Sequence, residues 1–102
     1  MDILTCTEQL RKKAAASPNG DSGLNATLKF DCGSDGIIFL DGEVVPNTVT
    51  NDQRDAECTV TISLVDLCAL LQGQLNPASA FMTGKLRVTG DMSVAMRLQR
   101  LV

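Results

Sequence analysis

Hydrophobic and polar residues alternate along the chain from residue 24 to residue 32. Apolar side chains occupy every second position, and the polar residues between them include Lys29 and Asp31. Because successive side chains of a strand point to opposite faces of a sheet, this pattern predicts a half-buried antiparallel strand. A second alternating run, from Cys58 to Ile62, predicts another strand of the same kind.

Two Asp-Gly dipeptides, at residues 35–36 and 41–42, lie between these two runs. Asp-Gly favours tight hairpin turns, so the dipeptides predict a short strand over residues 37–40. A calcium loop is not predicted here, because the position at which such a loop needs a bidentate Glu is Gly42. The strands are therefore expected to form a meander with one apolar face.

A further strand is predicted to begin at Val44 and Val45. Pro46 ends this strand early or confines it to the edge of the sheet, because proline has no N–H to donate to a ladder. Residues 47–57 are mostly polar, and we expect them to form a loop.

Helical spacing of apolar residues and helix-capping side chains indicate four helices. The first covers residues 3–16, where Cys6 and Leu10 share one face, and it stops at the turn-forming segment 17–20. The other three helices each begin at a side chain that can accept a hydrogen bond from the first turn: Ser63, Asn76 and Asp91.

In the helix that begins at Asn76, the predicted buried side chains are Ala80 and Phe81, with Met82 at the margin. The shared face of the final helix is predicted from i, i+3, i+4 and i+7 spacing as Met92, Ala95, Met96 and Gln99. Between these two helices, alternating Leu86 and Val88 predict a fifth strand. The element order is αββββααβα, which indicates an α+β fold with a five-stranded, mostly antiparallel sheet covered by helices.

The chain has 102 residues, which fits a single domain over residues 1–102. Its net charge of −3 argues against nucleic-acid binding, which needs a basic surface. The charge is uneven: residues 1–63 contain ten acids and five bases, whereas residues 64–102 contain two acids and four bases. These four bases are consistent with contact to an anionic membrane surface, although for any single one of them a solvated helix or strand face is the more common explanation: Lys85, Arg87, Arg97 and Arg100.

The chain contains no histidine, and its four cysteines show no C-x-x-C spacing. A zinc site is therefore not predicted, and neither is any other metal or cofactor. Cys32 and Cys58 occupy apolar-facing strand positions, so we expect them to be buried, reduced thiols. Without a signal peptide or an apolar run near 18 residues, we expect a cytoplasmic protein, and we expect it to be monomeric.

No catalytic constellation is visible in the sequence. Without histidine, a Ser or Cys nucleophile would need Lys or a carboxylate as its base, and no Ser-x-x-Lys or Gly-x-Ser-x-Gly motif occurs. No P-loop or Gly-x-Gly-x-x-Gly turn is present either. We therefore predict a non-enzymatic function with no catalytic residues, and an acid–base enzyme that uses Asp or Glu stays open as an alternative.

Three blocks within residues 57–101 carry a more specific pattern. They are Cys58-Thr59-Val60-Thr61-Ile62-Ser63, then Leu70-Leu71-x-Gly73-x-Leu75-Asn76-Pro77-x-x-Ala80-Phe81-Met82-x-Gly84-Lys85-Leu86, then Val88-x-Gly90-Asp91-Met92-x-x-Ala95-Met96-x-Leu98-Gln99. In this register the segment closely resembles the sterol carrier protein-2 (sterol-transfer) family. Ser93 stands where that family usually has glycine, and residues 1–56 match the family in layout only.

The resemblance implies a non-enzymatic carrier in which an apolar tunnel runs between a five-stranded sheet and its helices. Members of that family bind sterols, fatty acids, fatty acyl-CoAs or phospholipids. Some members end in a peroxisomal tripeptide, which this chain lacks, so the resemblance suggests a bacterial or cytosolic stand-alone carrier. An alternative function is an accessory domain that presents an acyl or isoprenoid substrate to a partner enzyme.

The tunnel implied by the resemblance needs an apolar wall, for which we select large side chains of the expected sheet and helices. For each of them, plain core packing is an equally good interpretation. The candidates for the wall are Phe30, Ile38, Leu67, Leu71, Phe81, Met82, Met92 and Met96, with Gln99 as a polar group at the mouth.

Overall fold

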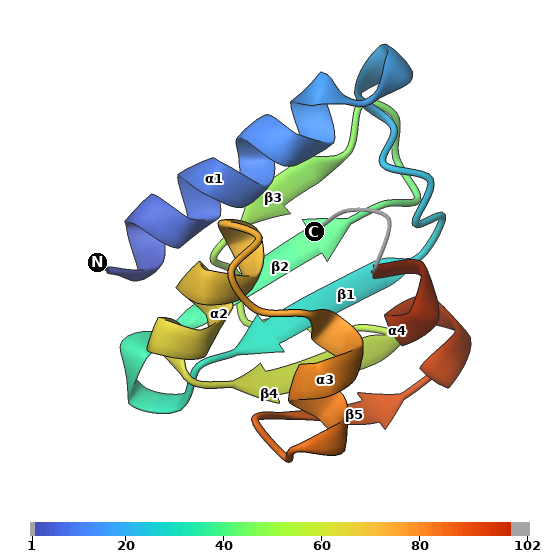
Figure 1. Cartoon of the computed structure of the whole chain (residues 1–102). Helices are drawn as coiled ribbons and strands as arrows, with labels where there is room; N and C mark the ends of the chain where they lie inside the picture. Colours follow the sequence, from blue (N-terminus) through green and yellow to red (C-terminus); the bar gives the residue numbers. More distant parts are fainter. Residues whose placement is uncertain (1, 99–102) are drawn as a thin grey trace.

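Five strands form one sheet, and four α-helices lie on one of its faces, within residues 2–98, which the computed structural model describes (Figure 1). In chain order the elements are α1 (Ile3–Ala16), β1 (Thr27–Asp31), β2 (Ile37–Asp41), β3 (Thr48–Thr50), β4 (Cys58–Ile62), α2 (Leu64–Leu71), α3 (Pro77–Met82), β5 (Leu86–Gly90) and α4 (Met92–Arg97), with 3₁₀ turns at Pro18–Gly20 and Gly33–Asp35. The predicted order αββββααβα and the α+β class are confirmed.

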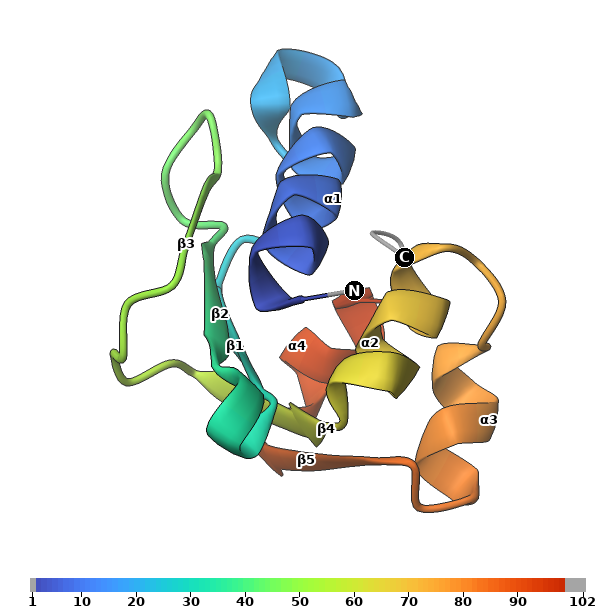
Figure 2. The same cartoon turned by 90° about the vertical axis from the view of Figure 1, so that its left-hand side faces the viewer.

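The strands lie in the order β3-β2-β1-β4-β5, so β3 and β5 are the edges of the sheet. All neighbours are antiparallel except β1 and β4, which run parallel. Phe30 of β1 lies opposite Ile38 of β2 and Val60 of β4, and Val60 in turn lies opposite Val88 of β5. Figure 2 shows that the sheet bends, so that β2 and β3 stand beside α1 whereas β5 runs below α3 and α4.

The predicted third strand is in the wrong place. Val44 and Val45 are exposed in a turn that contains the cis peptide bond before Pro46. The strand forms instead at Thr48–Thr50, where the side chain of Val49 is buried and pairs with Leu40 of β2. The strand forms in this polar segment because the β-branched Val49 is buried against the neighbouring strand. This contact is tertiary, so the local sequence pattern does not predict it.

The first strand is shorter than its alternating pattern predicts. Asn25 adopts a left-handed conformation with φ of 54°, which interrupts the extended backbone before the ladder begins at Thr27. Leu24 and Ala26 are nevertheless buried, so the alternation predicted the buried face correctly while overestimating the length of the strand.

Cys6 of α1 and Cys68 of α2 form a disulfide, with Cα atoms 6.0 Å apart and 62 residues of sequence separation. Cys32 and Cys58 are free and buried, as expected. Burial raises the pKa of the Cys32 thiol to about 11 and raises the pKa of Cys58 as well. The four cysteines therefore divide into one cross-link between helices and two protonated thiols in the core.

Buried side chains of every strand and of all four helices meet in one cluster between the sheet and the helix layer. Phe30, Ile38, Leu67 and Leu71 belong to it and are almost completely inaccessible to solvent. None of the helices within residues 2–98 combines the length and apolar character needed to cross a bilayer.

Candidate ligand-binding pocket

A cavity of about 260 Å³ opens between α3, β5 and α4, at the end of the sheet far from α1. Its floor is formed by inward-facing side chains of β4 and β5, and its walls come from the two short helices. The lining residues are Val60, Leu86 and Val88 on the strands, Pro77, Ala78, Phe81 and Met82 on α3, and Met92, Ala95, Met96 and Leu98 at α4. All of these side chains are apolar.

Helix α3 is held in place mainly by its ends. The side chain of Asn76 accepts hydrogen bonds from the N–H groups of Ala78 and Ser79 at 2.9 and 3.2 Å, and Pro77 occupies the first turn, where no N–H is needed. At the other end the Lys85 N–H donates to the Ala80 carbonyl at 2.9 Å. Between these ends Ala80 is the only fully buried residue of the helix.

Helix α4 begins at Asp91, whose carboxylate accepts hydrogen bonds from the backbone N–H and the hydroxyl of Ser93 at 2.9 and 2.7 Å. These hydrogen bonds hold the pKa of the Asp91 carboxyl below its usual value. Ser93 therefore adds a second cap contact through its side chain. The glycine before the cap is required, because a Cβ on Gly90 would lie 2.4 Å from the Glu57 carbonyl oxygen.

The prediction of which side chains α3 and α4 bury was partly wrong. Ala80 is buried as expected, but Phe81 is 47% exposed and Met82 is 84% exposed. In α4 the buried pair is Val94 and Leu98, and not the face that contains Met92 and Met96. A six-residue helix is too short for its periodicity to define one face, so contact with the sheet decides its rotation.

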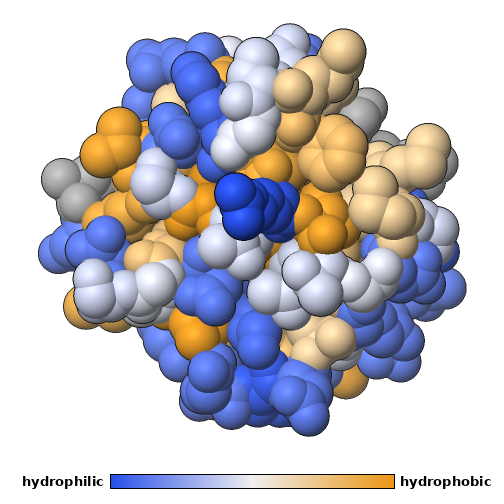
Figure 3. All heavy atoms as spheres, turned by 90° about the horizontal axis from the view of Figure 1, so that it is seen from below, coloured by the Kyte–Doolittle hydropathy of each residue, from blue (hydrophilic) through white to orange (hydrophobic). Residues whose placement is uncertain are grey.

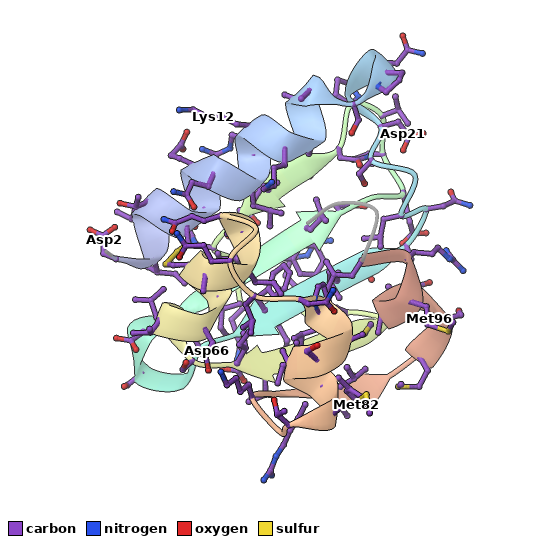
Figure 4. All side chains as sticks on the ribbon, in the orientation of Figure 1. Asp2, Lys12, Asp21, Asp66, Met82 and Met96 are labelled. Atoms are coloured by element: carbon purple, nitrogen blue, oxygen red, sulfur yellow. A yellow bond between two sulfur atoms is a disulfide. The ribbon has the colours of Figure 1, made fainter. Side chains whose placement is uncertain are left out.

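The large apolar side chains of both helices point outward around the cavity. Met92 is 47% exposed and Met96 is 69% exposed, and Figure 4 shows Met82 and Met96 on the outside of the layer that α3 and α4 form. Solvent therefore reaches the cavity between two helices whose exposed surfaces are rich in methionine.

The structure separates the predicted wall residues into two groups. Phe81, Met82, Met92 and Met96 line the cavity, whereas Phe30, Ile38, Leu67 and Leu71 lie in the filled core and do not line it. Gln99 lies outside the described residues. The role of any of these side chains in ligand contact stays a prediction.

Sequence reasoning did not select the strand residues of the floor or the smaller residues of α3 and α4. The alternating pattern identified Leu86 and Val88 as inward-facing. The one sequence feature that pointed to a cavity beside them was that β5 is followed directly by a short helix. A position at the edge of the sheet leaves such side chains incompletely covered, but the strand order is not visible in a local pattern.

A second groove, of about 340 Å³, lies along α2. Its lining includes the amide side chains of Gln72 and Gln74 as well as Leu64, Val65, Cys68 and Ala69. Within the part of the chain that the structure describes, the lining comes from one helix and the turn after it. The cavity beside α4 is the better candidate for an apolar ligand.

The fold and this cavity define a small α+β domain in which an apolar pocket opens between a sheet and its covering helices. Residues 7–102 match the SCP-2 sterol transfer family, and the chain belongs to this family. The resemblance found in residues 57–101 is thereby confirmed. The match also includes residues 7–56, for which the sequence had shown a similar layout only.

The chain is 50% identical over 83 residues to "Sterol carrier protein 2" of Oryctolagus cuniculus, a match that covers 81% of this chain and 14% of that protein. It thus spans about a seventh of the length of that relative. The sterol carrier protein domain 2 of Helicoverpa armigera has the same fold, with a TM-score of 0.79 at 24% identity over 97% of this chain and 84% of that one. The palmitated SCP2L2 of Aedes aegypti gives a TM-score of 0.71 at 22% identity, over 97% and 92% of the two chains.

Proposed function

We propose that the chain binds the apolar part of a lipid in the cavity between α3, β5 and α4 and carries it without catalysing a reaction. The observation that carries this proposal is an open cavity of about 260 Å³ that is lined, within residues 2–98, by apolar side chains alone. Methionine side chains at its mouth adapt to ligands of irregular shape because they are unbranched and flexible. Candidate ligands are a fatty acid, a fatty acyl-CoA, a phospholipid or a sterol.

Apolar burial alone supplies enough free energy for useful affinity. Removing about 15 methylene groups from water contributes roughly 12 kcal/mol before the costs of association and ordering. Micromolar binding needs about 8 kcal/mol. A pocket without a polar anchor can therefore hold an acyl chain, and discrimination between lipids would depend on length and shape.

The size of the cavity suggests that it widens when a long chain enters. Pockets for small molecules usually measure about 300–1,000 Å³, so the cavity of about 260 Å³ is at the small end. Helix α3 buries only Ala80, and α4 is held by Val94 and Leu98. Outward movement of α3 would therefore expose little core and is the least costly way to enlarge the pocket.

Among residues 2–98, no titratable side chain lines the cavity, which supports a non-enzymatic role. General acid–base catalysis would need a carboxylate or another titratable group brought to the ligand from elsewhere. Cys58, a core thiol of β4, has a raised pKa because of its burial, so it is protonated and unreactive at neutral pH.

A second candidate is a domain that presents the bound lipid to an enzyme. The cavity is open to solvent between α3 and α4, so part of a bound chain would stay accessible. The match covers only 14% of the rabbit relative, so in that protein the matching segment is part of a much longer chain. A stable complex with an enzyme of acyl or isoprenoid metabolism would favour this function over free transport.

Filling the cavity tests the site. Val88→Trp places a large side chain on its floor, and we expect affinity for a fluorescent fatty acid to fall at least tenfold because the volume is occupied. Leu4→Trp, on the exposed side of α1, is the control and should leave the affinity unchanged. Native mass spectrometry of the purified wild-type protein should detect a bound lipid.

Two results would contradict the proposal. Equal affinities of the two tryptophan variants, with thermal melts showing both to be folded, would place the ligand elsewhere. A wild-type protein that neither co-purifies with lipid nor binds acyl chains in titration would remove the lipid-carrier function itself.

A further inference from the structure

The last strand of the sheet, β5, has one side without a neighbouring strand. We propose that β5 pairs with β5 of a second copy of the chain, antiparallel and about a two-fold axis at Val88, so that the two sheets become continuous. This inference goes beyond the proposed function, because it concerns a contact between protein chains. It revises the expectation of a monomer that the sequence analysis gave.

The two edges of the sheet differ in how they are covered. The edge strand β3 has three residues and lies beside α1, where the guanidinium of Arg11 donates a hydrogen bond to the Val49 carbonyl at 2.7 Å. Strand β5 has five residues and forms the lower border of the sheet in Figures 1 and 2. Among residues 2–98, no other element hydrogen-bonds to the outer side of β5. Such an edge is a template for another strand.

Alternate residues of β5 direct their backbone groups to this open side. The Asp91 N–H donates to the Glu57 carbonyl at 2.9 Å, so Asp91 belongs to the set of residues that bond to β4. Hydrogen bonding alternates along an antiparallel pair, so the N–H and C=O groups of Leu86, Val88 and Gly90 point outward. With the axis at Val88, these three residues would pair with the same three residues of the second copy.

The charges beside these residues fit a pairing centred on Val88. Lys85, just before β5, would lie opposite Asp91 of the second copy, just after its β5, and the same contact would repeat on the other side of the axis. Arg87 would lie opposite Thr89, which is uncharged. Opposite charges that face each other across two antiparallel strands stabilise the pair. The sequence around β5 is therefore complementary to itself in this register.

Neighbouring registers lack this complementarity. With the axis at Arg87 the two Arg87 side chains would face each other, and with the axis at Leu86, Lys85 would face Arg87. Like charges directly opposite each other destabilise a strand pair. With the axis at Thr89, Leu86 would fall opposite Met92, which already belongs to α4. Of these four axes, the proposed one alone pairs the whole of β5 without placing like charges opposite each other.

Exposed apolar side chains flank β5 as well. In residues 2–98 eight large apolar side chains are exposed, and four of them belong to α3 and α4, the helices before and after β5: Phe81, Met82, Met92 and Met96. Figure 3 views the molecule from below, the side on which β5 lies, and shows hydrophobic side chains gathered around hydrophilic ones. Large apolar groups clustered on one surface mark a site of interaction. A second copy would bring its own α3 and α4 to the same face of the joined sheet.

The pairing has a consequence for the cavity. Val88 lines the cavity floor, so an axis at Val88 places the floors of the two copies side by side. The two cavities would then be neighbours on one face of the joined sheet. This consequence alone rests on the proposed function, whereas the pairing of the strands does not require a bound lipid.

A cysteine on the proposed axis tests the register. Val88→Cys places two thiols opposite each other with Cα atoms about 5.5 Å apart, a separation that a disulfide spans. With oxidised glutathione as the oxidant, this variant should form a covalent dimer in non-reducing electrophoresis. In the matched control Thr89→Cys, the two copies of the cysteine would be diagonal neighbours about 7–8 Å apart, so we expect little cross-linking. The wild type reports the background from the buried thiols Cys32 and Cys58.

A charge reversal tests which residues face each other. Lys85→Glu would place a carboxylate opposite Asp91 on both sides of the axis, and we expect the dissociation constant of the dimer to rise about tenfold. Arg87→Glu makes the same change of charge two residues along, where the residue directly opposite is the uncharged Thr89, and should raise the constant by about threefold at most. Sedimentation equilibrium of the lipid-free protein measures both. We expect a weak dimer, because one short strand pair buries less than the roughly 1,600 Å² of a standard interface.

Three results would overturn the proposal. Preferential cross-linking of Thr89→Cys would move the axis away from Val88, and equal weakening by Lys85→Glu and Arg87→Glu would show that the charges do not set a register. A mass of one chain at every concentration, without a cross-link in Val88→Cys, would leave this edge to an extended segment of another protein. Fatty-acid titration reports separately on the cavity, so a failure of lipid binding is distinguishable from a failure of pairing.

Discussion

The two halves of the sheet carry similar apolar side chains but differ in how their helices cover them. Under α1 and α2 the core is filled, and a disulfide between Cys6 and Cys68 joins the two helices. Under α3 and α4 a cavity remains, and the longest apolar side chains face outward. One sheet therefore supports a closed half and an open half.

Helix length and anchoring account for this difference. Helix α1 has 14 residues and α2 buries four of its eight, whereas α3 and α4 have six residues each, of which one is fully buried. Short helices gain little from burial and depend on capping and on their connections. The candidate cavity therefore lies where the fold has the least covering structure.

Core truncation should show the largest contrast between the halves. Leu67→Ala in α2 removes a fully buried side chain and should lower the free energy of unfolding by about 2–5 kcal/mol. Met82→Ala in α3 removes an exposed side chain and should change it by at most about 0.5 kcal/mol. Urea denaturation measures both values, and similar losses in the two variants would contradict the division into halves.

The disulfide should make the next largest contribution. Cys6→Ser removes a cross-link across 62 residues of sequence, so we expect a loss of about 2–4 kcal/mol, chiefly because the unfolded chain regains freedom. Treating the wild type with a phosphine reductant should give a loss of similar size, while Cys32→Ser controls for the removal of a free thiol. If reduction leaves the wild-type stability unchanged, the cross-link does not secure the closed half.

Much of this fold was predictable from local patterns. The bounds of the helix at residues 3–16 and the caps at Asn76 and Asp91 follow from nearest-neighbour chemistry, so the sequence predicted them correctly. The strand at Thr48–Thr50 was missed because its stability comes from pairing with β2. Local rules predict elements well when the interactions that define them are also local.

The site was harder to predict for the same reason. Phe30 and Phe81 have equal hydrophobicity, yet one fills the core and the other lines the cavity. This outcome depends on the rotation of a six-residue helix, which is set by contact with the sheet. The link between Cys6 and Cys68 was hidden too, because four cysteines allow three complete pairings and several partial ones.

A matched pair of caps gives the smallest and most selective contrast. Asn76→Ala at α3 and Ser63→Ala at α2 each remove a side chain that accepts hydrogen bonds from the first turn of a helix. Each should cost about 1 kcal/mol of stability, measured by urea denaturation. The two variants should therefore lose a similar amount of stability, although Asn76→Ala acts on the open half of the sheet and Ser63→Ala on the closed half.

Their effects on ligand affinity should differ, because α3 forms a wall of the cavity and α2 does not. Hydrogen exchange of the amides in 77–82 should accelerate in Asn76→Ala, and affinity for a fluorescent fatty acid should change by about three- to fivefold, since about 1 kcal/mol of local stability is at stake. An increase would mean that loosening α3 helps the chain to enter, and a decrease would mean that α3 must stay folded to hold it. Ser63→Ala should leave the affinity unchanged, and an equal shift in both variants would show that the open half does not respond independently of the closed one.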